Sequence, residues 1–475
     1  MNLKPTKIVL LTALVLAGLL IWFLMANPTR DFVASEPGMD NRGKGSALSE
    51  IINIGEFFKR FTQKESDLKE TWPRFRGSDF DNIYKTDRKL ASKFDAGAGD
   101  ILWSKELGEG HAGAAIYEGK VYLLDYNESE RADVLNCFDL KTGELLWQRW
   151  YKVPIKRNHG MSRTVPAITD SYILTMGPRC HVMCLDRESG DMIWNLDIEK
   201  EYESETPLWY TGQCPLIDNG VAVLATGGKS LMVGIDCATG EKLWETPNPD
   251  NWKMSHSSVM PYTFSGKKMY LYMAVGGVVA VSADEADRGS VLWNYSGWSA
   301  NVIAPSPLAM PDGKIFLTAG YGAGGLMLQL NENSGNFTVD VLHQYRPNTG
   351  LACEQQTPIY WQGHLFGILP KDGGVNRNQM VCVHPSDPTT MVWTSDKDIR
   401  FGLGPFILAD GKFYLLNDDG VLYIIEASTR GFKILDSKTL IADGHDAWAP
   451  IALADGYMVL RDANTLVCIN IMEGF

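Results

Sequence analysis

The segment CFDLKTGELLW, at residues 137–147, shares one pattern with CLDRESGDMIW at 184–194 and GIDCATGEKLW at 234–244. Each copy has a small residue, an apolar residue, Asp, two variable residues, Thr or Ser, Gly, three variable residues and Trp. Weaker copies follow at 281–293, 328–341, 383–393 and 425–434, and ILWSKELG at 101–108 resembles the closing part of a copy. The tryptophans at 103, 147, 194, 244, 293 and 393 are separated by 44, 47, 50, 49 and 100 residues, the last being two units. A period of about 48 residues indicates a repeat protein.

Each copy of the pattern predicts two strands joined by a tight turn. Apolar residues alternate on both sides of the Asp-x-x-Thr-Gly core, where Gly tolerates positive φ and Asp or Thr oxygens accept turn amides. A second strand pair precedes each hairpin, such as TVPAI with YILTMG at 164–177. Units of four antiparallel strands, repeated in this way, are typical of a β-propeller, because radial packing gives every unit the same neighbours.

The count of strands predicts eight blades. The inner strand of the hairpin occurs eight times, but its first outer strand, Ile101 to Lys105, precedes every other strand, and the last unit ends at Ile471 without one. These two halves complete one blade and remove an exposed edge. We therefore predict an all-β, eight-bladed β-propeller over residues 101–475, closed by an N-terminal outer strand that joins the last blade.

The N-terminal part predicts one transmembrane helix before the propeller. Residues 8–25 are 18 uncharged residues, about 27 Å as a helix, with Lys4 and Lys7 before them and the first acidic residue at Asp31. The positive-inside rule then gives an inner-membrane signal-anchor with a cytoplasmic tip at 1–7 and a periplasmic or other extracytoplasmic propeller. A signal peptide cleaved near Ala26 is the alternative. A linker with a short helix over 48–61 is expected within residues 26–70, and a lead-in segment over 71–100.

Charge and cysteine content exclude several classes of partner. The 475 residues carry a net charge of −13 and no long basic run, which argues against nucleic acid. Of the 8 cysteines, Cys137, Cys184, Cys382 and Cys468 occupy equivalent strand positions, so we expect free thiols in the core. The spacing of Cys180 and Cys184 matches neither a haem nor a zinc motif. No metal site is predicted.

Proline recurs where each inner strand begins, at positions 166, 215, 261, 307, 358, 405 and 450. Proline is tolerated there because an inner strand is an edge. Residues just before these positions should surround one mouth of the central channel. They are His111, Arg163, Gln213, His256, Ser257, Asn301, Glu354, Gln355, Arg400 and Trp448.

Two interpretations of this ring remain open. Arg163 and Arg400 provide charge, and the amides and His256 provide hydrogen bonds, for a small polar or anionic ligand. Alternatively, these are ordinary polar loop residues that bond to one another beside a channel. Of the histidines, His343, His364 and His384 are expected to be structural, and His111, His256 and His445 are candidates for function.

The repeats resemble those of the bacterial quinoprotein-type propellers, the PQQ-repeat or BamB-like family, across residues 100–471. Trp72 to Gly77 (WPRFRG) also resembles the lead-in of exported members. The resemblance implies that one set of tryptophans docks between neighbouring blades and plays a structural role: Trp147, Trp194, Trp244, Trp293 and Trp393.

The same resemblance raises the possibility of a dehydrogenase that uses pyrroloquinoline quinone (PQQ) and Ca²⁺. In that case Glu354 and Asn301 would be calcium ligands and Arg400 would lie beside the quinone. The sequence has no adjacent cysteine pair, no clear Asp in the inner ring and no long covering insertions. We therefore predict a non-catalytic binding or scaffolding module without a cofactor, for an envelope protein partner or a small polar ligand. The PQQ/Ca-dependent dehydrogenase is the alternative.

Overall fold

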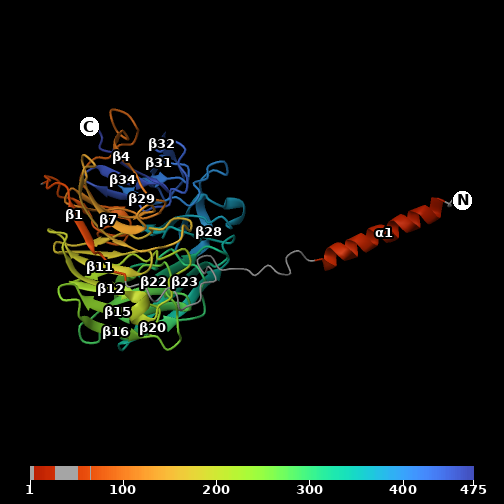
Figure 1. The fold of residues 1–475 in the computed structure, drawn as a ribbon, viewed down its shortest axis with the longest axis horizontal. Coiled ribbons are helices and arrows are strands. Elements are labelled where there is room, and N and C mark those ends of the chain that lie inside the picture. The colour runs from red at the N-terminus through yellow and green to blue at the C-terminus, as the bar shows by residue number, and fades with distance from the viewer. Residues whose placement is uncertain (1–4, 27–51, 65, 475) are drawn as a thin grey trace. The chain divides into compact units, whose positions relative to one another are not determined.

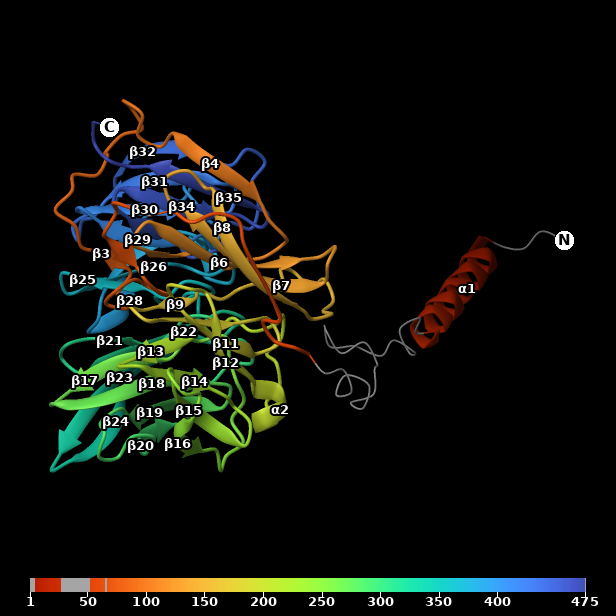
Figure 2. The ribbon, with the colours of Figure 1, turned by 60° about the vertical axis from the view of Figure 1, so that its left-hand side comes forward.

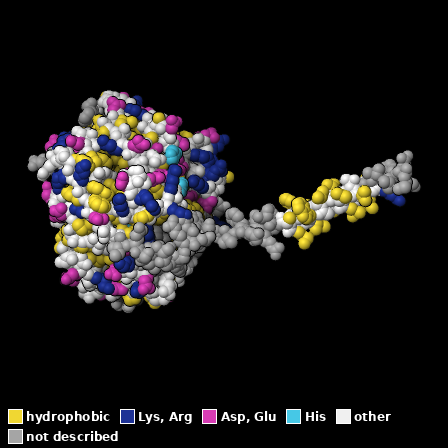
Figure 3. All heavy atoms as spheres, viewed as in Figure 1, with side chains coloured by type: hydrophobic (Ala, Val, Ile, Leu, Met, Phe, Trp, Pro, Cys, Tyr) yellow, Lys and Arg dark blue, Asp and Glu magenta, His cyan; other side chains and the backbone are white. Residues whose placement is uncertain are grey.

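The computed structural model describes residues 5–26, 52–64 and 66–474, and the chain divides into two units, 1–50 and 51–475. In the first unit, α1 spans Pro5–Met25, and Figure 3 shows apolar side chains along it. Among the residues that the structure describes, no helix is found that is long and apolar enough to cross a bilayer. The transmembrane assignment of residues 8–25 therefore stays a prediction.

The second unit is a β-propeller, as predicted (Figure 1). Eight sheets, counted over the described residues, succeed one another along the chain, and the four strands of each blade pair antiparallel. Blade 1 contains β5 (Ala115–Tyr117), β6 (Lys120–Asn127), β7 (Ala132–Asp139) and β8 (Leu145–Lys152), and blade 2 contains β9 (Ala167–Ile168), β10 (Tyr172–Met176), β11 (His181–Asp186) and β12 (Met192–Asp197). Blade 3 contains β13 (Leu216–Asp218), β14 (Val221–Ala225), β15 (Ser230–Asp236) and β16 (Lys242–Pro247), and blade 4 contains β17 (Met260–Phe264), β18 (Lys267–Ala274), β19 (Gly277–Ser282) and β20 (Val291–Tyr295).

The remaining blades follow the same order, from the inner strand to the outer strand. Blade 5 contains β21 (Leu308–Ala309), β22 (Lys314–Ala319), β23 (Gly324–Asn333) and β24 (Asn336–Tyr345), and blade 6 contains β25 (Ile359–Trp361), β26 (His364–Ile368), β27 (Met380–His384) and β28 (Asp387–Thr394). Blade 7 contains β29 (Phe406–Ala409), β30 (Lys412–Leu416), β31 (Val421–Glu426) and β32 (Ile434–Thr439), and blade 8 contains β33 (Ala452–Ala454), β34 (Tyr457–Arg461), β35 (Thr465–Asn470) and β4 (Ile101–Glu106). Short helices α2 (Ile198–Tyr202) and η1 (Gly374–Asn376) lie in connections.

The predicted closure of the ring is confirmed. The N-terminal strand β4 pairs antiparallel with the C-terminal strand β35, with Trp103 opposite Cys468. The last blade therefore takes its outer strand from the beginning of the propeller, which leaves no open edge between the first and last blades.

The hairpin turns form as the repeat predicts. In the first copy, the Asp139 carboxylate accepts hydrogen bonds of 2.8 Å from the Thr142 amide and 2.7 Å from its hydroxyl. Gly143 follows at φ 67°, a conformation that costs glycine little. Asp186 with Ser189 repeats this arrangement in blade 2.

The tryptophan that ends each repeat packs against the following blade. The Trp194 indole donates a 3.0 Å hydrogen bond to the backbone oxygen of Cys237, and Trp393 donates one of 2.9 Å to Ser428. Trp244 lies against Gly289 of the next turn, where an added Cβ would come within 3.0 Å of the ring. Trp147 and Trp293 are also buried. These positions are consistent with a structural role in holding neighbouring blades together.

The prediction of a short helix over 48–61 is wrong for residues 52–61. Residues 48–51 lie outside the described residues. The chain instead forms strand β1 (Phe57–Arg60), which pairs antiparallel with β8, the outer strand of blade 1. Phe57 stacks on Trp150 with ring centres 5.5 Å apart. Short isolated helices are marginal, so strand pairing and aromatic contact with an existing sheet favour the extended form.

The lead-in segment extends along the inner strands of the ring. Strand β2 (Thr71–Trp72) pairs with β5, and β3 (Ile83–Tyr84) pairs in parallel with β29, beside which it lies in Figure 2. Between them, the Arg76 guanidinium donates to the backbone oxygens of Phe80 at 2.8 Å and of Thr357 and Pro358 at 3.1 Å. Because the free edges of inner strands face the axis of a propeller, residues 71–84 occupy the channel.

Candidate functional site

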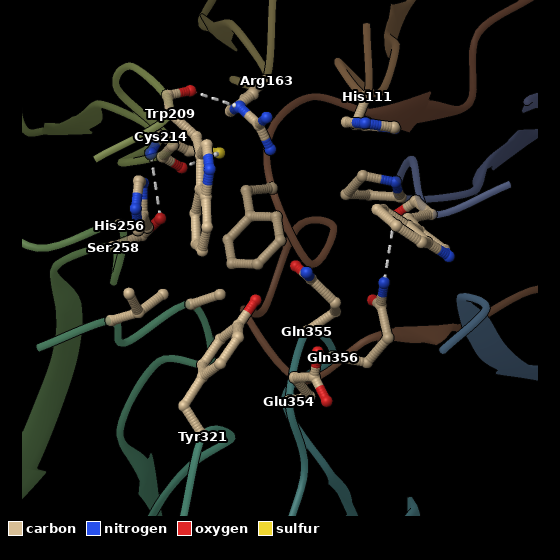
Figure 4. A pocket seen from close by; sticks show the side chains of 16 residues that line it. His111, Arg163, Trp209, Cys214, His256, Ser258, Tyr321, Glu354, Gln355 and Gln356 are labelled. Atoms are coloured by element: carbon tan, nitrogen blue, oxygen red, sulfur yellow. Dashed lines mark hydrogen bonds between the residues drawn. The ribbon is translucent and has the colours of Figure 1, made fainter. Parts of the chain in front are cut away.

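A pocket lies at the channel mouth where the sequence places the polar ring (Figure 4). The prolines precede or begin the inner strands as expected, for example Pro166 before β9 and Pro358 before β25. The space open to the centres of water molecules is about 80 Å³. The pocket is lined by Phe75, His111, Arg163, Trp209, Gly212, Cys214, His256, Ser258, Val302, Ala304, Tyr321, Glu354, Gln355, Gln356, Trp448 and Pro450.

Six of the ten predicted ring residues line this pocket. They are His111, Arg163, His256, Glu354, Gln355 and Trp448. Their binding of a ligand stays a prediction, but the structure brings them together from the beginnings of five different blades.

The other four predicted residues lie elsewhere. Gln213 is buried and makes two hydrogen bonds with the backbone of Ala225, at 2.9 and 3.0 Å. Ser257 is fully buried, and Asn301 is exposed outside the lining. Arg400 donates to the backbone oxygens of Arg377 and Val375. Gln213 and Arg400 therefore bond to nearby backbone, and none of the four residues lines the cavity.

Several lining residues were missed because they come from parts of the chain that do not repeat. Phe75 belongs to the lead-in, between β2 and β3, and reaches the pocket only because that segment occupies the channel. Trp209 follows α2, and Tyr321 lies in the loop between β22 and β23. The glycine-rich run AGYGAGG at 319–325 is the one signal that marks Tyr321 as unusual among the inner hairpins.

His111 is a buried imidazole without a hydrogen-bonding partner. It is 7% exposed, and neither ring nitrogen has a partner. Its ring centre lies 5.0 Å from that of Trp448. Burial, reinforced by the nearby charges of Arg163 and Arg461, lowers the pKa of His111 well below its usual value. The ring is therefore neutral at pH 7, with one N–H and one lone pair available to a ligand.

His256 is neutral for the same physical reasons. Burial, followed by the charge of Arg163, lowers the pKa of His256 to about 3. Gly212 packs against it so closely that an added Cβ would lie 3.0 Å from the His256 Cβ. The neighbouring Cys214 thiol has its pKa raised by burial to about 11, which keeps it protonated and a poor nucleophile.

Arg163 brings a positive charge to the pocket without a carboxylate partner. Its Nε donates a 2.7 Å hydrogen bond to the backbone oxygen of Trp209, and a terminal nitrogen donates to the backbone oxygen of His159. No carboxylate in the described part of the chain lies within 4.0 Å of Arg163. Burial lowers the pKa of Arg163 to about 10, which still leaves it charged at pH 7.

Glu354 brings a negative charge that is also unpaired. Glu354 is only 7% exposed, and its Oε2 accepts a 3.4 Å hydrogen bond from the Lys371 amide. No Lys or Arg among the described residues forms an ion pair with it. Burial raises the pKa of Glu354, and burial together with the Glu354 charge raises the pKa of Tyr321 to about 12. Two opposite charges thus share one pocket without pairing with each other.

Hydrogen bonds between successive blades fix the geometry of the mouth. The Cys214 amide donates to Ser258 Oγ at 2.9 Å, the Ser258 amide to Ser306 Oγ at 3.0 Å, and the Ser306 amide to Thr357 Oγ1 at 2.8 Å. Val165 extends this series with a 3.2 Å hydrogen bond to Cys214 Sγ. The beginnings of five inner strands, from blade 2 to blade 6, are therefore held in register around the pocket.

The pocket residues do not fit calcium and PQQ. Within the described ranges, no group of three or more His, Cys, Asp and Glu side chains is arranged to hold a metal ion. Glu354 is the single carboxylate in the lining and Arg163 the single cation, whereas PQQ is a rigid three-ring molecule with three carboxylates. Asn301 and Arg400, the other residues that the dehydrogenase alternative requires, lie outside the lining. We derive no reaction step through this cofactor.

Comparison with known proteins agrees with the fold. The family model described as outer membrane protein assembly factor BamB matches residues 130–350. The predicted resemblance to the PQQ-repeat, BamB-like propellers is therefore confirmed. A comparison with curated protein sequences gives no match.

Solved structures of similar fold include BamB and two dehydrogenases. BamB from Moraxella catarrhalis is 13% identical, with 78% of this chain and 99% of that chain covered and a TM-score of 0.52. A europium-containing methanol dehydrogenase is 10% identical, with 85% and 98% covered and a TM-score of 0.60. Quinohemoprotein alcohol dehydrogenase from Comamonas testosteroni is 11% identical, with 84% and 80% covered and a TM-score of 0.56. At these identities the likeness concerns the fold alone.

Proposed function

We propose that this chain is a non-catalytic, membrane-anchored propeller that binds a small polar ligand at the channel mouth. The observation that carries the proposal is the unpartnered pair of ring nitrogens of His111 in a wall that also presents Arg163 and Glu354. Buried polar groups are normally hydrogen-bonded. A pocket that leaves His111 without a hydrogen-bonding partner, and Arg163 and Glu354 without an opposite charge, is suited to a ligand that supplies them.

The pocket favours binding over catalysis because its reactive groups are held in unreactive states. Cys214 stays protonated and is a poor nucleophile, and His256, with a pKa of about 3, is only a weak base. The aromatic side chains Trp209, Tyr321 and Trp448 instead offer flat walls. Concave sites with apolar walls and a few convergent polar groups are typical of small-molecule binding.

The experiment is a survey of small polar solutes against the whole purified chain by saturation-transfer NMR, with an Ala304→Trp variant that fills the pocket. Ala304 lines the pocket, so the bulky ring is expected to abolish the saturation transfer seen with the unmodified protein. Thr338→Trp, on the exposed outer strand β24, is the matched control and should bind normally. Equal binding by both variants, or no binding by the unmodified chain, would contradict the proposal.

The proposed anchor is α1, with the propeller on the extracytoplasmic side. The apolar side chains of α1 support this proposal, since they include Leu14 at 62% and Trp22 at 67% exposure. Removal of residues 1–26 should move the protein from the membrane fraction to the soluble fraction. The unmodified chain should stay in the membrane fraction after a high-salt wash, which releases proteins bound only by charge.

A protein partner is a second role, supported by exposed apolar residues on the outer strands. Leu102, Leu243 and Val392 precede the docking tryptophans and are 38%, 48% and 45% exposed. Such repeated apolar positions fit a partner with an apolar contact surface. A photo-crosslinker at position 243 should capture such a partner in intact cells, whereas one at the exposed polar position 338 should not.

A further inference from the structure

The channel-mouth pocket contains one anion and one cation that face the same space. Figure 4 shows Arg163 and Glu354 entering from opposite sides, with the Gln355 side chain between them. In the described part of the chain, neither side chain has an oppositely charged partner within 4.0 Å. Glu354 is buried, at 7% exposure, and Arg163 is half-buried.

Charges removed from water are costly unless an opposite charge or strong hydrogen bonds replace the water. The backbone contacts of Arg163 and the Lys371 amide donor to Glu354 replace only part of that hydration. A ligand with one positive and one negative group would satisfy both side chains at once. A simple anion would leave Glu354 unpaired, and a simple cation would leave Arg163 unpaired.

We propose that the ligand is a small zwitterion of the amino acid class, whose carboxylate binds Arg163 and whose ammonium group binds Glu354. This inference rests on the proposed function, because it assigns a chemical class to the ligand of the same pocket. It concerns binding alone and involves no covalent step.

The neighbouring side chains match the two ends of such a ligand. His111 is neutral and its ring nitrogens have no partner, so it can donate an N–H to a carboxylate without adding charge. The phenol of Tyr321 and the amide of Gln355 lie toward the Glu354 side, where they can accept a hydrogen bond from an ammonium group. Polarity therefore changes across the pocket in the direction that a zwitterion requires.

Aromatic walls suit the short apolar part between the two charged ends. Trp209 and Tyr321 contact each other with ring centres 5.8 Å apart. Trp448 is fixed by a 2.8 Å hydrogen bond from its indole nitrogen to Asp418 Oδ1. Methylene groups packed against these rings would be removed from water, which favours binding.

The size of the pocket limits the ligand to a few non-hydrogen atoms. A volume of about 80 Å³ for water centres corresponds to roughly five to eight water molecules at 10–15 Å³ each. An amino acid with a short chain is of this size, whereas an oligosaccharide or an extended peptide is not. The proposal therefore names free amino acids and not segments of a protein.

The test is isothermal calorimetry of the whole chain with unbranched amino acids in which one to five methylene groups separate the ammonium group from the carboxylate. One member of the series is expected to bind most tightly, at the length that spans Arg163 and Glu354. It should bind about 10- to 100-fold more tightly than the alkylcarboxylate or alkylamine of the same length, because each lacks one charged hydrogen bond.

Two substitutions assign the ends of the ligand. Glu354→Gln should weaken the best amino acid about 10- to 100-fold and leave the matched carboxylate unchanged, whereas Arg163→Gln should weaken both. Glu285→Gln and Arg430→Gln change the same charges at exposed positions outside the pocket and should have no effect. Thermal unfolding midpoints of all four variants show whether each one is folded.

The possible outcomes separate this inference from the proposed function. If carboxylates bind as tightly as the matched amino acids, or if folded Glu354→Gln binds them equally, the zwitterion is wrong but the pocket still binds a small polar ligand. If no amino acid, carboxylate or amine binds, the zwitterion is also wrong, and the solute survey with Ala304→Trp then decides the proposed function independently.

Discussion

The indole nitrogen of Trp103 donates a 2.8 Å hydrogen bond to the backbone oxygen of Leu140. Trp103 lies on β4 in blade 8, and Leu140 follows β7 in blade 1. The contact therefore joins the last blade to the first and supplements the pairing of β4 with β35. Trp103 therefore contributes to ring closure as Trp194 and Trp393 contribute to the contact of their blades with the next blade.

Trp103→Ala should destabilise the propeller by about 3–5 kcal/mol, because a buried Trp leaves a large cavity and an unpaired carbonyl. The measurement is the shift in the guanidinium unfolding midpoint. Its neighbour Leu102, at 38% exposure, is the control, and Leu102→Ala should cost less than about 1 kcal/mol. Equal shifts for the two variants would contradict a special role for the closing contact.

Phe58→Ala should release β1 from blade 1 without unfolding the ring. The Phe58 ring lies 5.8 Å from that of Trp147, and the Arg149 guanidinium lies 4.7 Å from the Phe58 centroid. Limited trypsin digestion should cleave after Lys59 or Arg60 several times faster, while the thermal midpoint of the propeller changes little. Phe61→Ala, at a residue 46% exposed, should leave the cleavage rate unchanged.

Arg76→Met should destabilise the lead-in, since the carbonyls of Phe80, Thr357 and Pro358 lose their donor. Buried acceptors without partners cost about 1–3 kcal/mol each, so a loss on the order of 3 kcal/mol is expected in chemical unfolding. Ligand affinity should fall as well, because the adjacent Phe75 lines the pocket. Arg74→Met, two residues away, removes no such set of bonds and should cost less.

His256 should make the protein less stable in mild acid. Its pKa is about 3 in the folded protein against 6.5 in the unfolded chain, so the unfolded chain binds more protons between these values. Stability then falls as pH decreases from 6.5, by up to about 1.4 kcal/mol for each pH unit. In His256→Gln, the decrease in unfolding midpoint from pH 7 to pH 5 should be shallower. Parallel curves for the two proteins would show that His256 carries no such penalty.

All eight cysteines should react as free thiols after unfolding. Each is buried and free in the structure, including Cys184 and Cys237, which lie in adjacent blades. Titration with a chromogenic thiol reagent should therefore count eight thiols in denaturant without reductant, and close to none in the native protein. A count of six or fewer in freshly purified protein would indicate a disulfide.

The fold could be predicted because its determinants are local and repeated. Asp139, Gly143 and Trp147 act within one hairpin or on the next turn, and the same residues recur at the same spacing in later copies. The missing outer strand of the last unit also predicted the position of Ile101 to Lys105. Because the same residues recur at a fixed spacing, the sequence predicts one structural role for each of these positions in every repeat.

The pocket could be predicted only in part, because half of its wall does not repeat. His111, Arg163 and Glu354 were found from their positions before the inner strands. Phe75 and Trp209 were not, since long-range packing of the lead-in and of the loop after α2 brings them to the mouth. The strand β1 was missed for a similar reason: its partner β8 is about 90 residues away and no local pattern indicates it.

The segment from β2 to β3 affects how a ligand can reach the pocket through the central channel. Its strands β2 and β3 pair with the inner strands β5 and β29, and Phe75 between them lines the pocket. Because this segment occupies the channel, we expect a ligand of the proposed site between Arg163 and Glu354 to enter and leave through the channel mouth. The dissociation rate of such a ligand would then depend on the residues at the channel mouth.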